Sequence, residues 1–416
     1  MLGSKRRLGI AALLVLALVA AACGSSSKKS SSGGGATTTT ASAAKPTGAP
    51  IKIGVLTSIT GPSVHFPDVP QGAQAAADAI NAAGGVKDPA GGPNRPIEIV
   101  ACDDAFDPNQ AASCARKAVA DKELAMVGNV SPHGDVYAPI MYAAGIPLVG
   151  IQANAAAESL NELSFPMQGG SVVSLLSNVA FLAKQGVKKL TVEHIQNAAA
   201  DFLVAQMKKR AEALGMTVAN DVLVPADAAD MTSYAARFTS NGADGAVMVE
   251  PSDRVAKLIT ALNQGGVSLE KFKMSGQLNP GDLKKLGAAA NGFYGSDAAF
   301  PVDYTANPGI KQFVKEYSAL KNAADPSTFA LQAWVAVHVI AETLIPKMTT
   351  IDSASLVSTM KTIGPIARPE WTPFDWSQPV EAIPGLKLRS FSLKLLYSKA
   401  ENGKFTPVTS GFTQYL

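Results

Sequence analysis

The sequence predicts an α/β protein with two lobes, each a parallel β-sheet flanked by helices in the manner of a Rossmann fold. Three observations support this fold class. Short apolar segments alternate with amphipathic helical patterns from Ile51 onward. The apolar segments are continuous, as in strands that are buried on both faces. The strand candidates also fall into a group of four and a group of five, separated by the Pro- and Gly-containing segment 165–171.

The strand candidates of the first group are 51–57, 97–102, 124–128 and 147–151, and those of the second are 189–194, 218–224, 245–250, 273–276 and 292–296. Helices are expected between them, for example at 71–83 and 198–214. After a second crossing at 299–303, helices at 308–321 and 329–345 should return to the first lobe. Segments 390–397 and 404–408 flank Glu401-Asn402-Gly403 and predict a hairpin across the hinge or on the second lobe.

Residues 1–22 have the pattern of a secretory signal peptide, because Lys5-Arg6-Arg7 precede a short apolar run. Cys23 follows three alanines and resembles the lipobox of bacterial lipoproteins, in which the cysteine is acylated. Ala20 stands where that motif usually has leucine. The alternative is ordinary cleavage near Ala22 with a free cysteine. Residues 23–50 then form a lipidated cysteine and a flexible Ser/Thr/Gly tether.

The composition of the remaining chain excludes several classes of protein. Without the three signal-region cations, 36 − 3 = 33 Lys and Arg stand against 33 Asp and Glu. No basic run indicates a nucleic-acid partner. The apolar segment 329–345 contains Gln332, His338 and Glu342, which favours a core helix over a membrane span.

Cys102 and Cys114 are a candidate disulfide, since an exported chain with an even pair of cysteines favours one. Asp107-Pro108-Asn109-Gln110 predicts a capped helix start, which places Cys114 about two turns into that helix. The bridge should stabilise the fold by about 3 kcal/mol. A metal site is not expected, because no further ligands cluster nearby.

Residues 126–155 are the segment around which a binding site is expected. A strand leads into Ser131-Pro132, which fits a helix N-cap and first helical position. The start of that helix would present free N–H groups and partial positive charge above the strand ends, where a carboxylate binds well. The alternative is that Ser131 only caps its own helix.

The opening of the chain resembles the type I periplasmic binding proteins of the branched-chain amino acid and amide ABC importer group, a group that includes the leucine-binding proteins. The residues concerned are Ile51-Lys52-Ile53-Gly54-Val55-Leu56-Thr57, Thr60-Gly61-Pro62, Gln71-Gly72-Ala73 and 78–85, continued by Asp103-Asp104, Asp107-Pro108, Gly145-Ile146-Pro147 and 295–300. The resemblance implies two lobes joined by three hinge crossings. We expect lobe 1 at 51–168 and 302–375, and lobe 2 at 169–301 and 376–416.

The resemblance also implies ligand-binding positions in the first lobe. The loops after the third and fourth strands would hold a ligand carboxylate, and an aromatic residue of the first loop would cover its apolar part. These positions are Phe66, Ser131, His133, Gly134, Ala153 and Asn154. His65 and His133 have no partner serine or cysteine in the sequence pattern and are alternatively solvated loop residues.

The second lobe departs from the family pattern for an amino acid ligand. Related binders place acids and a tyrosine there for the ligand's ammonium group, whereas the matching positions here are Gly170, Ala199 and Gln277. Asn197 offers a polar group, and Glu250 is the one acid expected near the cleft; Glu250 is alternatively a solvated strand end or a helix cap. The ligand is therefore expected to carry an acidic or amide end and an uncharged remainder.

These observations predict a lipid-anchored extracytoplasmic solute-binding protein, monomeric and without a cofactor. Closure of the lobes on a small solute would be recognised by an ABC permease. The alternative is a sensor domain that signals through a separate partner. A secreted hydrolase is disfavoured, because neither a His-x-x-x-His metal pair nor a Gly-x-Ser-x-Gly motif occurs.

Overall fold

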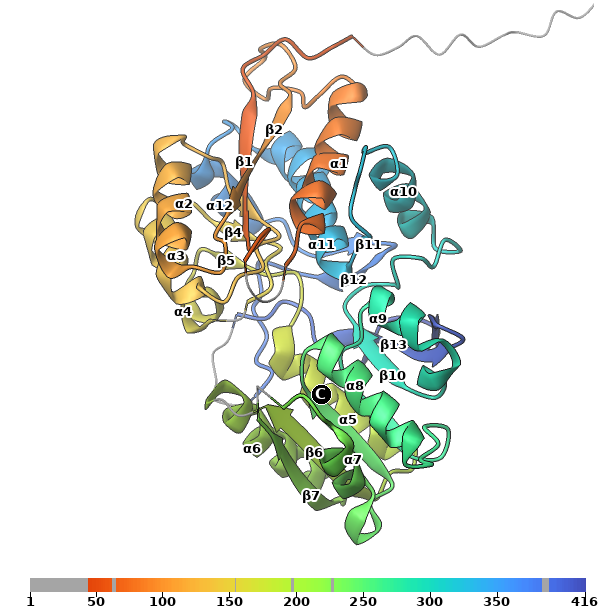
Figure 1. The fold of residues 1–416 in the computed structure, drawn as a ribbon. Helices are drawn as coiled ribbons and strands as arrows, with labels where there is room; N and C mark the ends of the chain where they lie inside the picture. The colour runs from red at the N-terminus through yellow and green to blue at the C-terminus, as the bar shows by residue number, and fades with distance from the viewer. Residues whose placement is uncertain (1–43, 62–64, 154, 196–197, 226–227, 384–388) are drawn as a thin grey trace, which may run out of the picture. The chain divides into compact units, whose positions relative to one another are not determined.

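The computed structural model describes residues 44–61, 65–153, 155–195, 198–225, 228–383 and 389–416 (Figure 1). Cys23, Asn154 and Asn197 lie outside these residues. The structure confirms the two-lobe α/β architecture with parallel sheets flanked by helices.

The first sheet is entirely parallel and has the strand order β2-β1-β3-β4-β5. Its strands are β1 (Ile51–Thr57), β2 (Ile97–Asp103), β3 (Met126–Val127), β4 (Leu148–Val149) and β5 (Ser164–Phe165). The β5 strand corrects the expectation that Phe165 belongs only to a crossing. Val149 pairs with the fully buried Phe165, so the sheet gains a fifth strand before the chain leaves it.

Helices cover both faces of this sheet (Figure 1). Val55 and Leu56 point to opposite faces, and they belong to the two hydrophobic clusters that the helices on either side complete. The helices of this part of the chain are α1 (Asp68–Ala82), α2 (Pro108–Ala120), α3 (Gly134–Ala143), α4 (Ala156–Leu160), α10 (Pro308–Tyr317), α11 (Thr328–His338) and α12 (Ser353–Met360). As predicted, the helices after β10 return to the first sheet, and α11 packs along α1.

The second sheet has the order β7-β6-β8-β9-β10-β13-β14, with β15 also paired to β13. The strands from β7 to β10 are parallel, and β13 runs antiparallel to β10. The predicted hairpin, β13 with β14, therefore belongs to the second lobe. The strands are β6 (Lys189–Ile195), β7 (Thr217–Val224), β8 (Gly245–Val249), β9 (Lys273–Ser275), β10 (Tyr294–Asp297), β13 (Lys394–Glu401), β14 (Lys404–Pro407) and β15 (Thr413–Gln414), and the helices are α5 (Gly170–Lys184), α6 (Ala198–Ala213), α7 (Thr232–Phe238), α8 (Ser252–Gln264) and α9 (Pro280–Leu286).

Cys102 and Cys114 form a disulfide that joins the end of β2 to α2, with their Cα atoms 5.7 Å apart. The local sequence sets this geometry. The Asp107 carboxylate accepts hydrogen bonds from the N–H groups of Asn109 and Gln110 and caps α2, which begins at Pro108 as predicted.

Helix α11 lies against three glycines through its alanines. A Cβ atom on Gly72 would lie 2.0 Å from the Ala330 carbonyl oxygen, and one on Gly128 would lie 2.5 Å from the Ala333 Cβ. One on Gly150 would lie 2.9 Å from the Ala336 Cβ. The alanines recur every three residues on one helix face. Only glycine allows this approach, so α11 rests directly on α1 and on the ends of β3 and β4.

The helical run Thr328–Lys347 is long and apolar enough to cross a membrane, and the described residues contain no other such run. Most of it is buried, and it consists of α11, the π-helix η3 (Val339–Leu344) and a short 3-10 turn. Gln332 and His338 are both buried within it and both hydrogen-bonded. It is the core helix that the sequence predicts.

Two tryptophans, Trp371 and Trp376, hydrogen-bond to the first crossing, segment 165–171. The indole N–H of Trp371 donates to the Met167 carbonyl at 3.1 Å, and that of Trp376 donates to the Pro166 carbonyl at 3.0 Å. Both rings are fully buried. Trp371 belongs to the small antiparallel pair β11 (Ile366–Arg368) and β12 (Trp371–Phe374).

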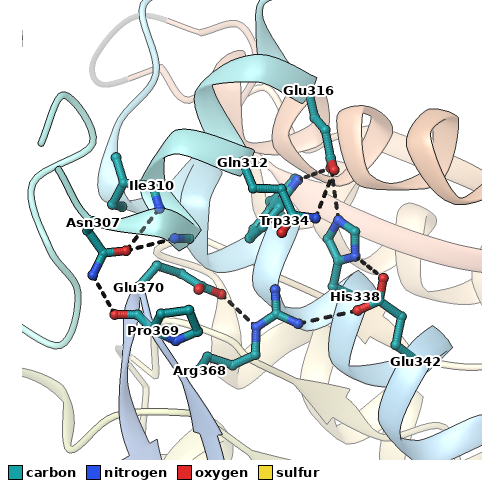
Figure 2. Close-up of polar contacts among 11 residues, drawn as sticks. Asn307, Ile310, Gln312, Glu316, Trp334, His338, Glu342, Arg368, Pro369 and Glu370 are labelled. Carbon is teal, nitrogen blue, oxygen red and sulfur yellow. Dashed lines mark hydrogen bonds and ion pairs between the residues drawn. The ribbon is translucent and has the colours of Figure 1, made fainter. Parts of the chain in front are cut away.

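A charged network joins α10, α11 and η3 to this small pair of strands (Figure 2). His338 is only 2% exposed; its Nε2 lies 2.9 Å from a Glu316 carboxylate oxygen and its Nδ1 lies 2.8 Å from one of Glu342. Arg368 contacts both Glu342 and the buried Glu370. Burial lowers the pKa of His338, but hydrogen bonds to Glu316 and Glu342 outweigh it, and the pKa is raised overall. Carboxylates only accept, so both ring nitrogens carry protons in this arrangement.

We predict that His338→Asn lowers the free energy of unfolding by about 3 kcal/mol at pH 6, because two carboxylates lose their cationic partner. The folded-state pKa of His338 is raised. Its stabilisation is therefore complete below the unfolded-state pKa of about 6.5 and is lost as pH rises through the folded-state value. Urea unfolding at pH 6 and pH 9 measures the change. The exposed His65→Asn serves as the control, and an equal loss for His338→Asn at both pH values would contradict the prediction.

Candidate functional site

The loops that follow β3 and β4 lie side by side at the carboxyl ends of the strands. The Gln152 N–H donates to the Asn129 carbonyl at 3.1 Å. The Asn129 side chain accepts from the Leu56 N–H at 3.1 Å, and the Thr57 hydroxyl donates to the Val130 carbonyl at 2.7 Å. The two loops in which the sequence predicts a binding site are thus fixed to each other and to β1.

Ser131 is not the N-cap that the sequence predicts. Helix α3 begins at Gly134, and His133 occupies its cap position. The Ser131 hydroxyl donates instead to the carboxylate of Asp104, which also accepts from Ser58 at 2.6 Å. Ser131 Oγ accepts from the His133 N–H at 3.1 Å. The single hydroxyl proton of the buried Ser131 is already used, so this residue shapes the loop and has no proton to donate to a ligand.

The start of α3 does retain free donors. Within the described residues, the N–H groups of Gly134 and Asp135 have no acceptor in the protein. Gly134 is buried against Glu158, because a Cβ there would lie 2.5 Å from the Glu158 carboxyl carbon. His133 is half-buried, and its ring meets the Phe106 ring edge-on, with centroids 5.9 Å apart. The donors expected for an anion are therefore backbone groups next to His133.

The start of α4 is occupied by the protein's own carboxylates. The Ala155 N–H donates to Glu158 at 3.0 Å, and the Ala157 N–H donates to Asp135 at 2.9 Å. Glu158 also accepts from the hydroxyl of the buried Tyr137, whose pKa is raised by burial and by the charge of Glu158. Ala153 is half-buried just before this helix, and its predicted neighbour Asn154 lies outside the described residues.

Phe66 is half-buried and meets the Phe329 ring edge-on, with centroids 5.6 Å apart. The first loop is fastened to the start of α11 beside it. The buried Asp68 carboxylate accepts from the Ser327 N–H at 2.9 Å and from its hydroxyl at 2.5 Å. Burial raises the pKa of Asp68 despite these hydrogen bonds. The hydrogen bonds between Asp68 and Ser327 therefore hold the Phe66–Phe329 pair in place.

Three glutamines connect this region to the first crossing. The Gln168 amide donates to Gln152 and, at 3.0 Å, to Gln332 of α11. The Gln332 amide donates to the Gly150 carbonyl at 2.6 Å. The chain of hydrogen bonds therefore connects the loop after β4 to the crossing and to α11.

In the second lobe, Glu250 is not the free acid near a cleft that the sequence predicts. Its side chain is fully buried and holds Arg254 in a two-point ion pair, with N···O distances of 2.5 and 3.1 Å. Arg254 also donates to the Pro225 carbonyl at 2.9 Å. Neither alternative applies, because Glu250 is not solvated and does not cap α8. Arg254 stands four residues later, on the first turn of α8, which is the spacing of a helical ion pair.

Glu193 lies beside this pair and is fully buried. Burial raises the pKa of Glu193 well above its usual value, and the neighbouring charge of Glu250 raises it further. Arg254 pairs with Glu250, whereas neither oxygen of Glu193 has a hydrogen-bond partner among the described residues, so the arrangement favours a protonated Glu193.

The remaining predicted positions of the second lobe are less constrained. Gln277 is exposed in the loop after β9, and its side chain has no hydrogen bond among the described residues. Asn197 lies outside them. Sequence reasoning missed Asp297, the acid that ends β10, although a strand-end acid is a recognisable signal. Within the described part of the chain, no group of three or more His, Cys, Asp or Glu side chains is placed to hold a metal ion.

We predict that Glu250→Gln lowers the free energy of unfolding by about 3 kcal/mol while changing ligand affinity little, because it leaves Arg254 buried without an anion. The matched variant Glu193→Gln should cost less than about 1 kcal/mol, since an amide replaces a protonated carboxyl group. Urea unfolding and calorimetry of both variants measure this. Unchanged stability together with lost binding in Glu250→Gln would show that the acid serves the ligand instead.

Known proteins share this architecture. Residues 50–379 match the family model described as periplasmic binding protein. A leucine-, isoleucine-, valine-, threonine- and alanine-binding protein of Pseudomonas aeruginosa is 25% identical over 306 residues, covering 70% of this chain and 77% of that protein. A Leu/Ile/Val-binding protein homologue of Brucella melitensis is 27% identical, covering 76% of this chain and 85% of its own.

Solved structures agree in fold. A leucine-binding protein from Thermotoga maritima has a TM-score of 0.68 at 17% identity, covering 88% of this chain and 99% of its own. A solute-binding protein from R. palustris in complex with benzoate has a TM-score of 0.67 at 18% identity, covering 88% of this chain and 98% of its own. These relatives are solute-binding proteins and not enzymes. The chain belongs to the periplasmic binding protein family, as a type I member of the branched-chain amino acid group.

Proposed function

We propose that this protein is a lipid-anchored solute-binding protein that captures a small carboxylate- or amide-bearing solute and delivers it to an ABC importer. The family and its extracytoplasmic location support the general role. The P. aeruginosa relative is named for aliphatic amino acids, and the R. palustris structure contains benzoate. A carboxylate is common to these ligands, so it is the group on which recognition in the first lobe should depend.

The observation that carries this proposal is the pair of free N–H groups at the start of α3. Helix α3 has ten residues, and its partial positive charge favours an anion at this end. The neighbouring α4 start is closed by Glu158 and Asp135, which directs a ligand carboxylate to Gly134. His133 and Ala153 would border the position, and Ser131 supports the loop. Asn154, which is part of the same proposal, lies outside the described residues.

The rest of the ligand would extend toward Phe66 and toward Gln277 of the second lobe. Asn197, also proposed as a contact, lies outside the described residues. We retain the lobe bounds 51–168 with 302–375, and 169–301 with 376–416, for a protein that acts as a monomer. Closure would change the backbone angles of the crossings. The glutamine chain and the two tryptophans then transmit that movement to the loop after β4.

The anchor belongs to the same proposal. Cleavage after residue 22 and acylation of Cys23 would leave 27 residues, 24–50, between the lipid and the first strand. A flexible chain of this composition has a reach on the order of 30 Å. The binding domain would therefore remain close to a membrane permease while it rotates freely.

The closure prediction is tested with a thermal-shift screen of amino acids, amides, aromatic acids and short carboxylates, followed by solution scattering. A ligand that binds only the folded protein raises its melting temperature by mass action. We expect the compound with the largest shift to lower the radius of gyration at saturation. Tight binding without compaction would contradict lobe closure.

The anchor prediction concerns Cys23→Ala. This variant should leave the membrane fraction and appear as soluble exported protein, because its thiol can no longer be acylated. Immunoblots of fractionated cells measure the distribution, with Cys102→Ala/Cys114→Ala as the control that keeps Cys23. Retention of Cys23→Ala at the wild-type level would show that the protein is not anchored through this residue.

A further inference from the structure

Strand β2 lies at the edge of the first sheet, and part of its outer side has no partner. In the described part of the chain, β2 pairs with β1 alone. The Ile51 N–H donates to the Pro96 carbonyl, and the Asp104 N–H donates to the Thr57 carbonyl. In a parallel pair this pattern uses the even-numbered residues of β2. The odd-numbered residues therefore direct their N–H and C=O groups outward.

These outward groups are blocked at the start of the strand and open in its middle. Asn81 of α1 donates to the Ile97 carbonyl and accepts from the Ile97 N–H, both at 2.8 Å. Among the described residues, no group outside the sheet bonds to the N–H and C=O groups of Ile99 and Ala101. Ala101 is exposed, and Val100 beside it is half-buried. An open edge of this kind accepts another strand.

The other long edge strand, β7, is protected where β2 is not. Arg237 donates to the Asp221 carbonyl of β7 at 3.1 Å, and Asn241 donates to the Ala219 carbonyl at 3.4 Å. These side chains occupy acceptors along the strand and discourage the addition of a further strand. The opening at the middle of β2 is therefore a property of that strand and not of both sheet edges.

A groove lies beside the open segment, on the side of the sheet that α1 covers. Its volume is about 270 Å³, and Ile99 and Ala101 line it. The other lining residues come from α1 and from the segment after α10, and they are Pro70, Gln71, Gln74, Leu320 and Lys321. When a strand is added to a sheet edge, main-chain hydrogen bonds provide affinity and pockets for alternate side chains provide specificity. The edge of β2 offers both.

The open segment is complementary to itself. When two copies of β2 pair in antiparallel fashion about a twofold axis at Val100, Ile99 of each copy stands opposite Ala101 of the other. Such opposed residues exchange both of their N–H···O=C bonds, so every open group of the segment gains a partner. The large Ile99 side chain then meets the small Ala101 beside the groove. Val100 meets its own counterpart on the opposite face of the sheet.

Charge does not oppose this pairing. Residues 99–101 are uncharged, and Glu98 of one copy would stand opposite Cys102 of the other, so no like charges face each other. After the signal region the chain carries 33 basic and 33 acidic residues, which keeps the repulsion between copies small. The short open segment and its match to its own sequence favour a second copy of this chain over an unrelated peptide.

We propose that two copies of this protein associate through antiparallel pairing of their β2 strands at residues 99–101, with Ile99 of each copy entering the groove of the other. The inference replaces the expectation that the protein stays monomeric. It does not depend on the proposed function, because no residue proposed to contact the solute belongs to this segment or lines the groove. Each copy would keep its own solute site. A surface limited to one strand segment and one groove predicts weak, concentration-dependent association.

The first test joins the two strands covalently in whole cells. The double variant Ile99→Cys/Ala101→Cys places a cysteine of each copy opposite one of the other, at a Cα–Cα distance of about 5.5 Å that permits a disulfide. Cys102 faces the opposite side of the sheet, so its own disulfide is left intact. Each single variant is a control, because its cysteines lie on a diagonal of about 7–8 Å, too long for a bridge. Non-reducing gels should show a species of twice the monomer mass for the double variant alone.

The second test measures association of the detergent-solubilised full chain by sedimentation velocity. Ala101→Pro removes an N–H that faces outward and is not used by β1, a change that an edge strand accepts. We expect it to raise the dissociation constant of the dimer at least about 10-fold, since two hydrogen bonds are lost from each dimer. Ala101→Ser keeps the N–H and should resemble the wild type. Thermal melts check that both variants fold, and the cysteine test decides if Ala101→Pro does not.

Three results would overturn the proposal. The first is a wild type that remains monomeric up to about 500 μM, together with no disulfide-linked dimer of the double variant. The second is a dimer that forms equally well in the folded Ala101→Pro variant, which would place the contact elsewhere on the surface. The third is a reducible adduct of another mass, which would show that a different polypeptide occupies the edge of β2.

Discussion

The close packing of α11 on three glycines is the constraint on which the rest of the first lobe depends. Gly72, Gly128 and Gly150 have no Cβ atoms, and Ala330, Ala333 and Ala336 fill the space instead. The helix thereby contacts α1 and the ends of β3 and β4 at once. Protein interiors tolerate little change in volume, so this contact fixes where the two loops begin. Gln332 adds a hydrogen bond to Gly150 across 182 residues of sequence.

Helix α11 follows the second crossing in the chain. The loops after β3 and β4 are therefore held by a helix that is also connected to the hinge. The glutamine chain runs from the loop after β4 through Gln168 of the first crossing to α11. The His338 network continues from α11 through Glu342 to Arg368 of β11 (Figure 2). Trp371 of β12 hydrogen-bonds to the first crossing. Core, hinge and candidate site therefore share one set of contacts, as a protein that couples binding to lobe movement requires.

Several acids of the chain are satisfied by other groups of the protein, and they are satisfied in different ways. Asp104 receives two serine hydroxyls, and Glu250 holds Arg254. Glu316 and Glu342 hold His338. Each of these groups has a partner that offsets much of its desolvation, which is sufficient reason for its presence. Asp297, like Asp104, receives hydrogen bonds from neutral donors only.

The sequence by itself determined the features that depend on neighbours along the chain. Continuous apolar runs located β1 and most strands of both sheets, and Asp107-Pro108 located the start of α2. The pair of Glu250 and Arg254 was not predicted, because Glu250 precedes α8 and the four-residue spacing applies to two residues of one helix. The alternation of apolar strand segments with amphipathic helices was enough to predict the fold class, because each helix or sheet must bury an apolar face against another element.

The tertiary structure alone decided which polar groups remain available at the candidate site. Ser131 fits an N-cap locally, but its hydroxyl donates a hydrogen bond to Asp104, which lies 27 residues away in sequence. Asp297 is one acid among many until the hydroxyl of Thr328, at the start of α11, donates a hydrogen bond to it. A hydroxyl or a carboxylate can satisfy several competing partners with similar energies, and only the folded chain determines which of them is close enough to bond.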